Sequence, residues 1–444
     1  MAAMPTAAYA YRGASALTPD GLGLSTSGGP SANPRFFQGF MTTPHTVAQG
    51  LLAVAEVARA RYFQPADRAA ILDPVVTGSE DMLRFESFSG CCGVYARMDV
   101  LPSGLDGERP EHGTTNVDVN APLQVALARV GGGDPLHLAV GPHDLTVSTM
   151  DGALVERKVP LPGRWLRGFA QVHAMTSGME PRAVVPGAEA AAFLQRLPRE
   201  RSVLWVVPAG RSLRLTARPV PGAVCLAGAQ RLAALRGLAR HAQTLTVYGP
   251  AARPGSPALA SVWELTTPTL RMSLTLSPEP YRGFSGEGAV LSALAADDLA
   301  DAADQIGELL GTVPTLDADA LAVATGLPAE RVRAALALLG TAGRVGYDVS
   351  EATYFHRVMP YGTDAAEKLN PRLSGAKALL DAGAVTFGDG VAHVRGNEGV
   401  YQVRLEHGVP AGCTCVWWGR HRGSRGPCRH QLATRLRLDA AVPR

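Results

Sequence analysis

Three cysteines and one histidine gather near the end of a 444-residue chain that contains only six cysteines. They form the pattern Cys413-Thr-Cys415 and, after twelve further residues, Cys428-Arg-His430. Three thiolates and one imidazole are a common donor set for tetrahedral zinc. Residues i and i+2 of a strand point to the same face, so Cys413 and Cys415 can reach one ion. Four protein ligands leave no open position for water, so the pattern predicts one structural zinc ion.

A helix is expected to start directly after this cluster, over residues 431–438. Its first turn can aim Cys428 and His430 inward, and helix N-termini favour the thiolate form of cysteine. Zinc binding could supply roughly 10 kcal/mol or more to the folding of a module that is too small for a core of its own.

The spacing resembles the SWIM zinc finger, whose pattern is C-x-C, a variable loop and C-x-H, and all four ligand positions match. The segments that begin at Val400 and at Gln431 also resemble the β-β-α frame of that family. The resemblance covers about residues 380–440 and implies a module that binds DNA or other proteins. The whole architecture resembles a bacterial SWIM-containing family that is often encoded with a MoxR-type AAA ATPase and a von Willebrand factor A protein. This implies a non-enzymatic adaptor with those two proteins as partners.

The loop between the two ligand pairs is rich in tryptophan and arginine. From Cys413 to Arg444 the chain has seven arginines and one acidic residue, although its overall formal net charge is only +3. Three interpretations stay open: the loop holds nucleic acid, it anchors a partner protein, or one tryptophan packs against the zinc module. The residues predicted to bind a partner are Trp417, Trp418, Arg420, Arg422 and Arg425.

Residues 83–285 are predicted to form a large β-rich domain with two lobes. Short runs with apolar residues at alternate positions recur in both halves, separated by Gly, Pro and Asp turns. Short helices are expected at 187–197 and 228–240. The segment from Leu145 to Pro162 resembles a strand–Met-Asp-Gly–strand segment of sliding clamps, and no function is inferred from it. The expected strands include 116–120, 122–130, 136–140, 145–150, 202–207, 245–248, 262–266 and 272–276.

Residues 286–362 resemble a winged helix-turn-helix. Helices are expected at 290–294 and 299–310, and two more flank a turn at Thr325-Gly-Leu, before two strands that could form a wing. A second helix that reads DNA would usually display several Arg, Lys, Asn or Gln side chains. Here that helix offers only Arg331 and Arg333. DNA reading and a role in packing or protein contact therefore both stay open.

The remaining segments complete an α+β, multidomain fold. Residues 1–35 are rich in Gly, Pro and Ser, which indicates a flexible arm or an arm that lies on the body. Residues 36–82 are predicted to be an N-terminal helical segment, with a helix from Thr43-Pro44 to about Tyr62. Residues 363–444 form the SWIM-type zinc finger region, with a helix at 365–381 followed by strands at 384–387, 391–395 and 400–406.

Composition and missing motifs narrow the classes of function. Apolar residues make up 46% of the chain and charged residues 18%, which is typical of globular proteins. There is no basic-then-apolar start and no long apolar run, so a cytoplasmic protein without membrane contact is expected. No Walker A lysine, G-x-S-x-G or G-x-G-x-x-G motif is present, which disfavours an enzyme. Cys91, Cys92 and Cys225 are expected to pack in strands.

The favoured hypothesis is a cytoplasmic, non-enzymatic zinc-binding adaptor. Its SWIM finger and β-rich body would bind a partner protein and/or nucleic acid. The alternative is a DNA-binding protein that places the winged helix and the basic C-terminal tail on the duplex. A third hypothesis is an enzyme in the β-rich body, which would need a cleft with convergent polar groups.

Overall fold

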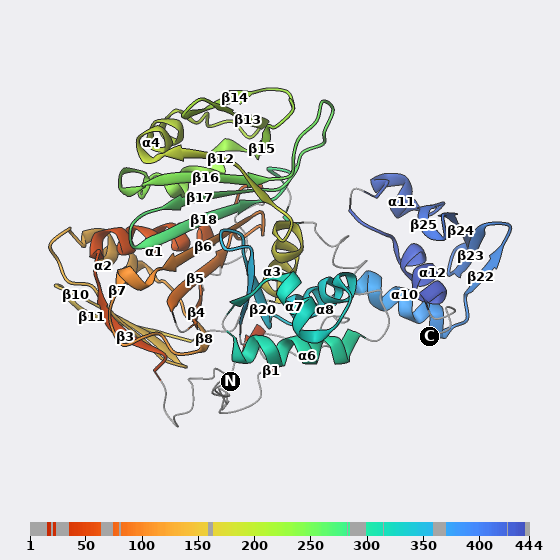
Figure 1. Ribbon diagram of the computed structural model, residues 1–444, viewed down its shortest axis with the longest axis horizontal. Helices are drawn as coiled ribbons and strands as arrows, with labels where there is room; N and C mark the ends of the chain where they lie inside the picture. Colours follow the sequence, from red (N-terminus) through yellow and green to blue (C-terminus); the bar gives the residue numbers. More distant parts are fainter. Residues whose placement is uncertain are drawn as a thin grey trace.

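The computed structural model has a large β-rich body with a smaller C-terminal lobe beside it (Figure 1). Most of the arm predicted for residues 1–35 lies outside the described residues, apart from the paired strands β1 (Ala16–Thr18) and β2 (Gly21–Gly23) and from Arg35. None of the described helices is long and apolar enough to cross a membrane. The described residues are 16–18, 21–23, 35–63, 74–79, 81–158, 163–281, 283–284, 299–313, 315–357, 370–423 and 425–439.

An eight-stranded antiparallel sheet runs through both halves of the body and confirms its predicted β-rich character. Its two halves meet at β18 and β6, which pair from Leu270–Val100 to Leu276–Val94. The pairing joins segments that are far apart in the sequence, so one sheet continues across the body. In spatial order the strands are β12 (Glu180–Pro186), β16 (Thr244–Gly249), β17 (Ser261–Thr266), β18 (Leu270–Leu276), β6 (Val94–Val100), β5 (Met82–Phe88), β4 (Val75–Ser79) and β8 (Gly113–Asn116).

Two smaller sheets flank the large one. The expected hairpin around Met150 is present, because β10 and β11 pair antiparallel. A five-stranded sheet has the order β11 (Gly152–Arg157), β10 (Asp144–Thr149), β9 (His137–Val140), β3 (Phe37–Met41) and β7 (Leu105–Gly107). A three-stranded sheet has the order β14 (Ser212–Thr216), β13 (Val203–Ala209) and β15 (Val224–Ala227).

Helix α1 (Pro44–Arg59) packs on the apolar face of the large sheet. Its start at Pro44 is as predicted, since a proline in the first turn lacks only an N–H that the helix does not need. The helix packs closely on the side chains of β6, because a Cβ at Gly50 would overlap the Sδ atom of Met98. Glycine at this position therefore sets the distance between helix and sheet. The main core joins Phe36, strand β3 and α1 with the apolar face of the sheet.

The prediction of a strand at 122–130 is wrong, because this segment is helix α2 (Ala121–Arg129). Asn120 caps the helix through its side chain, which accepts a hydrogen bond from the Leu123 N–H. The run alternates apolar and polar residues, but Leu123 and Leu127 also lie one helical turn apart. The Asn-Ala-Pro start favours the helix more than the alternation favours a strand. The Asn120 side chain accepts a hydrogen bond from an N–H that has no partner within the helix.

Other helices of the body match the sequence to different degrees. Helix α4 (Gly187–Arg196) confirms the expected helix at 187–197. The segment 228–240 forms 3-10 turns at η2 (Ala229–Leu235) and η3 (Ala239–His241), and a further short turn is η1 (Pro102–Gly104). Helix α3 (Gly163–Thr176) was not expected. It buries Trp165 and Phe169 against Phe88 of the large sheet.

The next segment alternates helices with a small sheet. Its elements are α6 (Leu299–Thr312), β19 (Thr315–Leu316), α7 (Ala318–Thr325), α8 (Ala329–Thr341), β20 (Val345–Asp348) and β21 (Thr353–His356). Strands β20 and β21 form a hairpin, and β19 pairs with the other side of β21. Gly326 ends α7 with a φ of 69°, a left-handed conformation that suits glycine. The expected helix at 299–310 is confirmed, and the one at 290–294 lies outside the described residues.

The C-terminal lobe is built on a four-stranded antiparallel sheet. Helices α10 and α12 cover one face of it, where Leu373 and Leu432 pack with Ala392, Val394 and Val403. The predicted strands and the C-terminal helix are present, and the helix expected at 365–381 is present from Pro371, with residues 365–369 outside the described residues. The elements are α10 (Pro371–Asp381), β22 (Val385–Gly388), β23 (Val391–Gly396), β24 (Gly399–Glu406), β25 (Val409–Cys413), α11 (Val416–His421) and α12 (Arg429–Asp439).

A charged face of the large sheet receives the β20–β21 hairpin. Asp348 at the end of β20 contacts Arg97 at 2.7 Å, Arg271 at 2.8 Å and Arg84 at 3.4 Å. All three arginines also lie within 3.5 Å of Asp99, so the three guanidinium groups share two buried carboxylates. Burial alone would raise the pKa of Asp348, but Arg97, Arg84 and Arg271 outweigh it and hold this pKa well below its usual range.

Replacing Asp348 with asparagine should destabilise the protein strongly. The change leaves three buried guanidinium groups with one carboxylate, and breaking a buried ion pair costs about 3–5 kcal/mol. The matched control is Glu351→Gln, which removes a contact of 2.7 Å with Arg271 from a side chain that is 58% exposed. Such an exposed pair should contribute less than about 1 kcal/mol. Denaturant unfolding measures both changes, and equal losses would contradict the assignment.

Two histidines, the buried His173 and the half-buried His356, lie where the hairpin segment meets the body. His173 of α3 packs against the rings of Tyr354 and Tyr347. Burial lowers the pKa of His173 to about 3, and the nearby Arg357 adds to this effect. Burial likewise lowers the pKa of His356 on β21 to about 4, with His112 and Arg344 adding to it. Both rings are therefore neutral in the folded protein at moderately acidic pH.

Stability should fall as the pH drops below about 6.5. His173 and His356 then bind protons in the unfolded chain but stay neutral in the folded protein. The loss continues toward their folded pKa values and reaches about 2 kcal/mol per histidine at pH 5. Glu156, whose pKa burial raises to about 7, acts with the opposite sign. The test therefore compares wild type with His173→Phe between pH 7 and pH 5. The variant should lose about 2 kcal/mol less, and identical pH profiles would refute this role.

Candidate metal centre

The four predicted ligands come together from three elements of the C-terminal lobe. Cys413 ends β25, Cys415 precedes α11 as its N-cap, and Cys428 and His430 lie at the start of α12. One donor atom from each residue lies within 4.8 Å of the other three. This group could therefore hold a metal ion. The predicted helix start positions Cys428 and His430, but the prediction that Cys413 and Cys415 share a strand is wrong, because β25 ends at Cys413 and Cys415 is the N-cap of α11.

The distances suit a tetrahedral ion. The Sγ atoms of Cys413 and Cys428 lie 3.7 and 4.0 Å from Nδ1 of His430. Zinc bonds of about 2.3 Å to sulfur and about 2.0–2.1 Å to nitrogen would place such donor atoms roughly 3.5–3.8 Å apart. These two sulfur–nitrogen pairs thus differ by only a few tenths of an ångström from the spacing around one ion, in a group whose four donor atoms all lie within 4.8 Å of one another.

Burial and mutual contacts raise the pKa values of the Cys415 and Cys428 thiols and so favour their protonated forms. A hydrogen bond with Cys413, together with burial, raises the pKa of Cys428 to about 12. Burial also raises the pKa of Cys415. The side chains of Cys415, Cys428 and His430 are at most 5% exposed. Metal binding must therefore release protons into solution, which makes the affinity fall as the pH falls.

Neighbouring groups orient the ligands. The backbone N–H groups of Trp418 and Gln431 donate to the Sγ atoms of Cys415 and Cys428, each at 3.5 Å. The ring of Tyr401 stacks on His430 with the centroids 4.2 Å apart. Such outer contacts fix ligand geometry and usually matter almost as much as the ligands. Tyr401 lies in the β-β-α frame that the sequence indicated, but the sequence did not predict its contact with His430.

Two of the five predicted partner-binding residues are engaged inside the lobe. The guanidinium of Arg372 on α10 lies 4.4 Å from the ring centre of Trp417, and that of Arg425 lies 5.6 Å from it. Arg372 also donates hydrogen bonds of 2.9 Å to the carbonyl oxygens of Arg425 and Pro427. Trp417 thus fits the interpretation in which one tryptophan packs against the module. Sequence reasoning missed Arg372, because it lies more than forty residues before the loop that it holds.

The other three predicted partner-binding residues lie on the outer side of the loop. Arg420 and Arg422 are exposed on or next to α11, and Trp418 is half-buried. Among the described residues, neither Arg420 nor Arg422 forms an ion pair. The structure therefore divides the loop into an inner side, formed by Trp417 and Arg425, and an outer side, formed by Trp418, Arg420 and Arg422.

The remaining cysteines are far from this site in the sequence and pack in the body. Cys91 and Cys225 are buried, and Cys92 is half-buried with a left-handed φ of 50°. Burial raises the pKa of the Cys225 thiol to about 11, as expected for an unreactive core cysteine. Among the described residues, the Cys413 group is the one cluster of three or more His, Cys, Asp or Glu side chains with metal-binding geometry.

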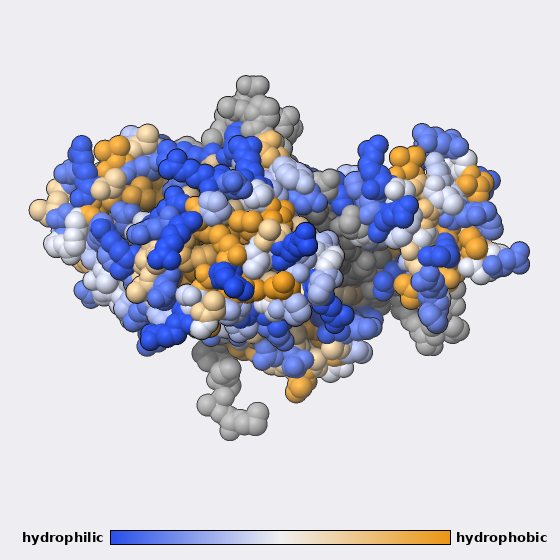
Figure 2. Space-filling view, turned by 90° about the horizontal axis from the view of Figure 1, so that it is seen from above, coloured by the Kyte–Doolittle hydropathy of each residue, from blue (hydrophilic) through white to orange (hydrophobic). Residues whose placement is uncertain are grey.

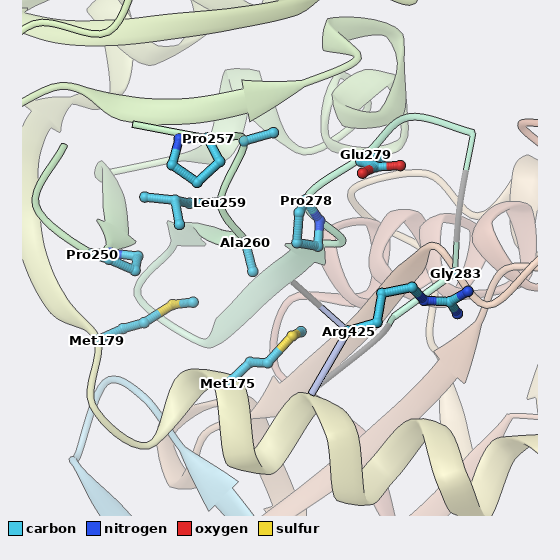
Figure 3. Close-up of a pocket in the computed structure, with 11 residues that line it drawn as sticks. Met175, Met179, Pro250, Pro257, Leu259, Ala260, Pro278, Glu279, Gly283 and Arg425 are labelled. Carbon is cyan, nitrogen blue, oxygen red and sulfur yellow. The ribbon is translucent and has the colours of Figure 1, made fainter. Parts of the chain in front are cut away.

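A cavity of about 380 Å³ lies where the body faces the zinc loop (Figure 3). Met175 and Met179 line one side and Leu259 the other, while Glu279 and Arg425 lie near one end. The described lining has no serine, cysteine or histidine that could act as a nucleophile or base. The enzyme hypothesis requires convergent polar groups, and this cavity offers only the two charged side chains.

Comparison with known proteins gives little further guidance. No family model matches the chain, and no curated protein matches it. One solved structure that matches is the proliferating cellular nuclear antigen of Entamoeba histolytica, with a TM-score of 0.35 and 8% identity over 55% of this chain and 98% of that one. Another is a PCNA2–PCNA3 complex of Sulfolobus tokodaii, with a TM-score of 0.40 and 8% identity over 55% of this chain and 100% of that one. Similarity at this level assigns no function.

Protein purified without chelator should contain one zinc ion per chain, as measured by elemental analysis. Cys428→Ser should lose it, since a serine hydroxyl is a poor zinc ligand and three donors remain. Cys225→Ala, which removes a buried cysteine outside the cluster, is the matched control and should keep the metal. Less than half an equivalent of zinc in the wild type, or unchanged zinc in Cys428→Ser, would rule out the site.

Proposed function

We propose that this protein is a non-enzymatic, zinc-binding adaptor whose C-terminal lobe presents a recognition surface to a partner protein or nucleic acid. The observation that carries the proposal is the convergence of three thiols and one imidazole within 4.8 Å. Four donors complete a tetrahedron and leave no position for a substrate or a reactive water. The zinc would thus act on structure, by holding both ends of the loop that carries Trp418, Arg420 and Arg422.

The proposal includes a SWIM-type finger as the identity of this lobe. The spacing of the ligands and the order of two strands before and one helix after the cluster support it. From the wider resemblance we propose that the adaptor acts in an ATPase-driven complex with a MoxR-type ATPase and a von Willebrand factor A protein. A reducing cytoplasm would suit the site, because it keeps three thiols available for zinc.

The alternative, a protein that reads duplex DNA with its winged helix, fits the contacts less well. The element order from α6 to β21 supports a winged-helix-like segment, but α8 is buried on several sides from Ala334 to Thr341. A Cβ at Gly340 would lie 3.5 Å from His173 of α3. The hairpin that would form the wing buries Asp348 in the body. Both elements that would touch DNA are thus used for internal packing.

Partner capture should depend on the zinc loop and not on α8. We expect Cys428→Ser to lose the partners that wild type retains from native cells, because the loop is no longer held at one end. Arg333→Ala removes an exposed charge of α8 and should retain them, as should Cys225→Ala. The measurement is affinity purification followed by mass spectrometry, with and without nuclease.

The contrary result is equally clear. If Arg333→Ala abolishes duplex DNA binding, and the wild-type affinity falls steeply with salt, the winged helix reads DNA and the alternative is correct. If Cys428→Ser retains every partner while its zinc is lost, the loop is not the recognition surface.

A further inference from the structure

The sheet of the C-terminal lobe has one face that α10 and α12 leave uncovered. Ala392, Val394 and Val403 point toward α10 and α12, so the alternate residues of β23 and β24 point the other way. In Figure 1 this sheet lies on the outer side of the lobe, with α10 and α12 toward the body. The side chains on the uncovered face include His393, Arg395, Val400, Gln402 and Arg404.

The pairing register brings these residues together. His393 lies opposite Gln402, and Arg395 lies opposite Val400. Neighbouring strands are about 4.8 Å apart, so these side chains form one continuous patch. Arg395, Val400, Gln402 and Arg404 are all exposed. Figure 2 shows hydrophilic residues over much of this lobe, with smaller hydrophobic patches between them.

Trp418 extends the patch over the last strand. Arg404 pairs with Gly412 of β25, so a Cβ at Gly412 would point to the uncovered face. Such a Cβ would lie 3.7 Å from Nε1 of Trp418 and 3.7 Å from Nε of Arg404. The indole therefore lies beside Arg404, above a position without a side chain. The zinc ligand Cys415, which caps α11, fixes the helix that brings Trp418 there.

The charge of the patch is positive. Between residues 370 and 439 the lobe has ten arginines and lysines and five acidic residues. Glu406 contacts Arg404 at 2.9 Å, with both side chains more than half exposed. An exposed pair of this kind is weak, so a phosphate could replace the carboxylate. Arg420 and Arg422 add two exposed cations next to Trp418.

We infer that this face, formed by Arg395, Gln402, Arg404 and Trp418, binds single-stranded nucleic acid. An aromatic ring beside arginines provides both a surface for base stacking and charges for the backbone. A duplex fits less well, because four strands span roughly 14 Å and the major groove, about 12 Å wide, admits a helix or a two-stranded ribbon. The inference rests on the proposed function, since the zinc-held loop positions Trp418.

The test uses the full-length protein and fluorescein-labelled twelve-nucleotide oligo-dT and oligo-rU, with a duplex of the same length. Fluorescence anisotropy in a salt series gives affinity and salt dependence. We expect single strands to bind more tightly than the duplex and to quench tryptophan emission. Trp418→Ala should weaken binding at least about fivefold, because stacking on one base is lost. Trp418→Phe keeps a ring and should bind nearly as wild type, but without the quench.

The arginines have their own variant and control. A double variant, Arg395→Gln with Arg404→Gln, should reduce the slope of the log of the binding constant against the log of the salt concentration by about 1.4. This is about 0.7 for each lost phosphate contact. Arg214→Gln removes an exposed arginine from β14, an edge strand of the body, and should change neither affinity nor slope.

Several outcomes would overturn the inference. They are equal or tighter binding of the duplex, no binding of any oligonucleotide at low salt, tighter binding of poly-glutamate than of the oligonucleotides, or affinities that these variants leave unchanged. Zinc content is measured on the same samples. If the protein contains zinc but does not bind single strands, only this inference is contradicted. If the protein contains no zinc, the proposed function is contradicted as well.

Discussion

The placement of the hairpin segment on the body depends on Asp348. Its carboxylate is fully buried among Arg84, Arg97 and Arg271, and the large sheet supplies Asp99 as the second anion. Charges this deep are costly to desolvate, so the contact holds only when the geometry is nearly complete. A shift of the hairpin would leave several charges buried without partners. This makes the position of β20 and β21 more specific than apolar packing alone would, and it keeps the proposed wing in the interior.

Local sequence signals predicted the elements whose boundaries are set by nearby residues. Proline starts α1, and alternation marks β22 to β24 of the C-terminal lobe. The failure at 122–130 has a physical reason, since leucines at that spacing serve a strand or a helix, and the cap at Asn120 decides between them. The charged face of the sheet could not be predicted, because Arg84, Asp348 and Arg271 meet only through the fold.

The metal cluster could be predicted, because its ligands are close together in the sequence. Its four ligands lie within eighteen residues, and the two short spacings keep each pair close, at the junction of β25 with α11 and at the start of α12. The role of the loop between them was not predictable from the same residues. Trp417 and Trp418 are adjacent and chemically identical, yet Arg372 holds the first of them inside the lobe. A tryptophan's function there depends on a helix that lies outside the motif.

The zinc site and Arg372 together determine what the loop can recognise. The ligands would hold both ends of the segment from Cys415 to Cys428, and Arg372 contacts it near each end, at Trp417 and at the carbonyl oxygens of Arg425 and Pro427. A loop held at three places has lost most of its conformational entropy before a partner arrives, so binding costs less. What remains outside is Trp418 with the exposed Arg420 and Arg422. The proposed recognition surface is therefore the outer half of the loop and the sheet face that continues from it.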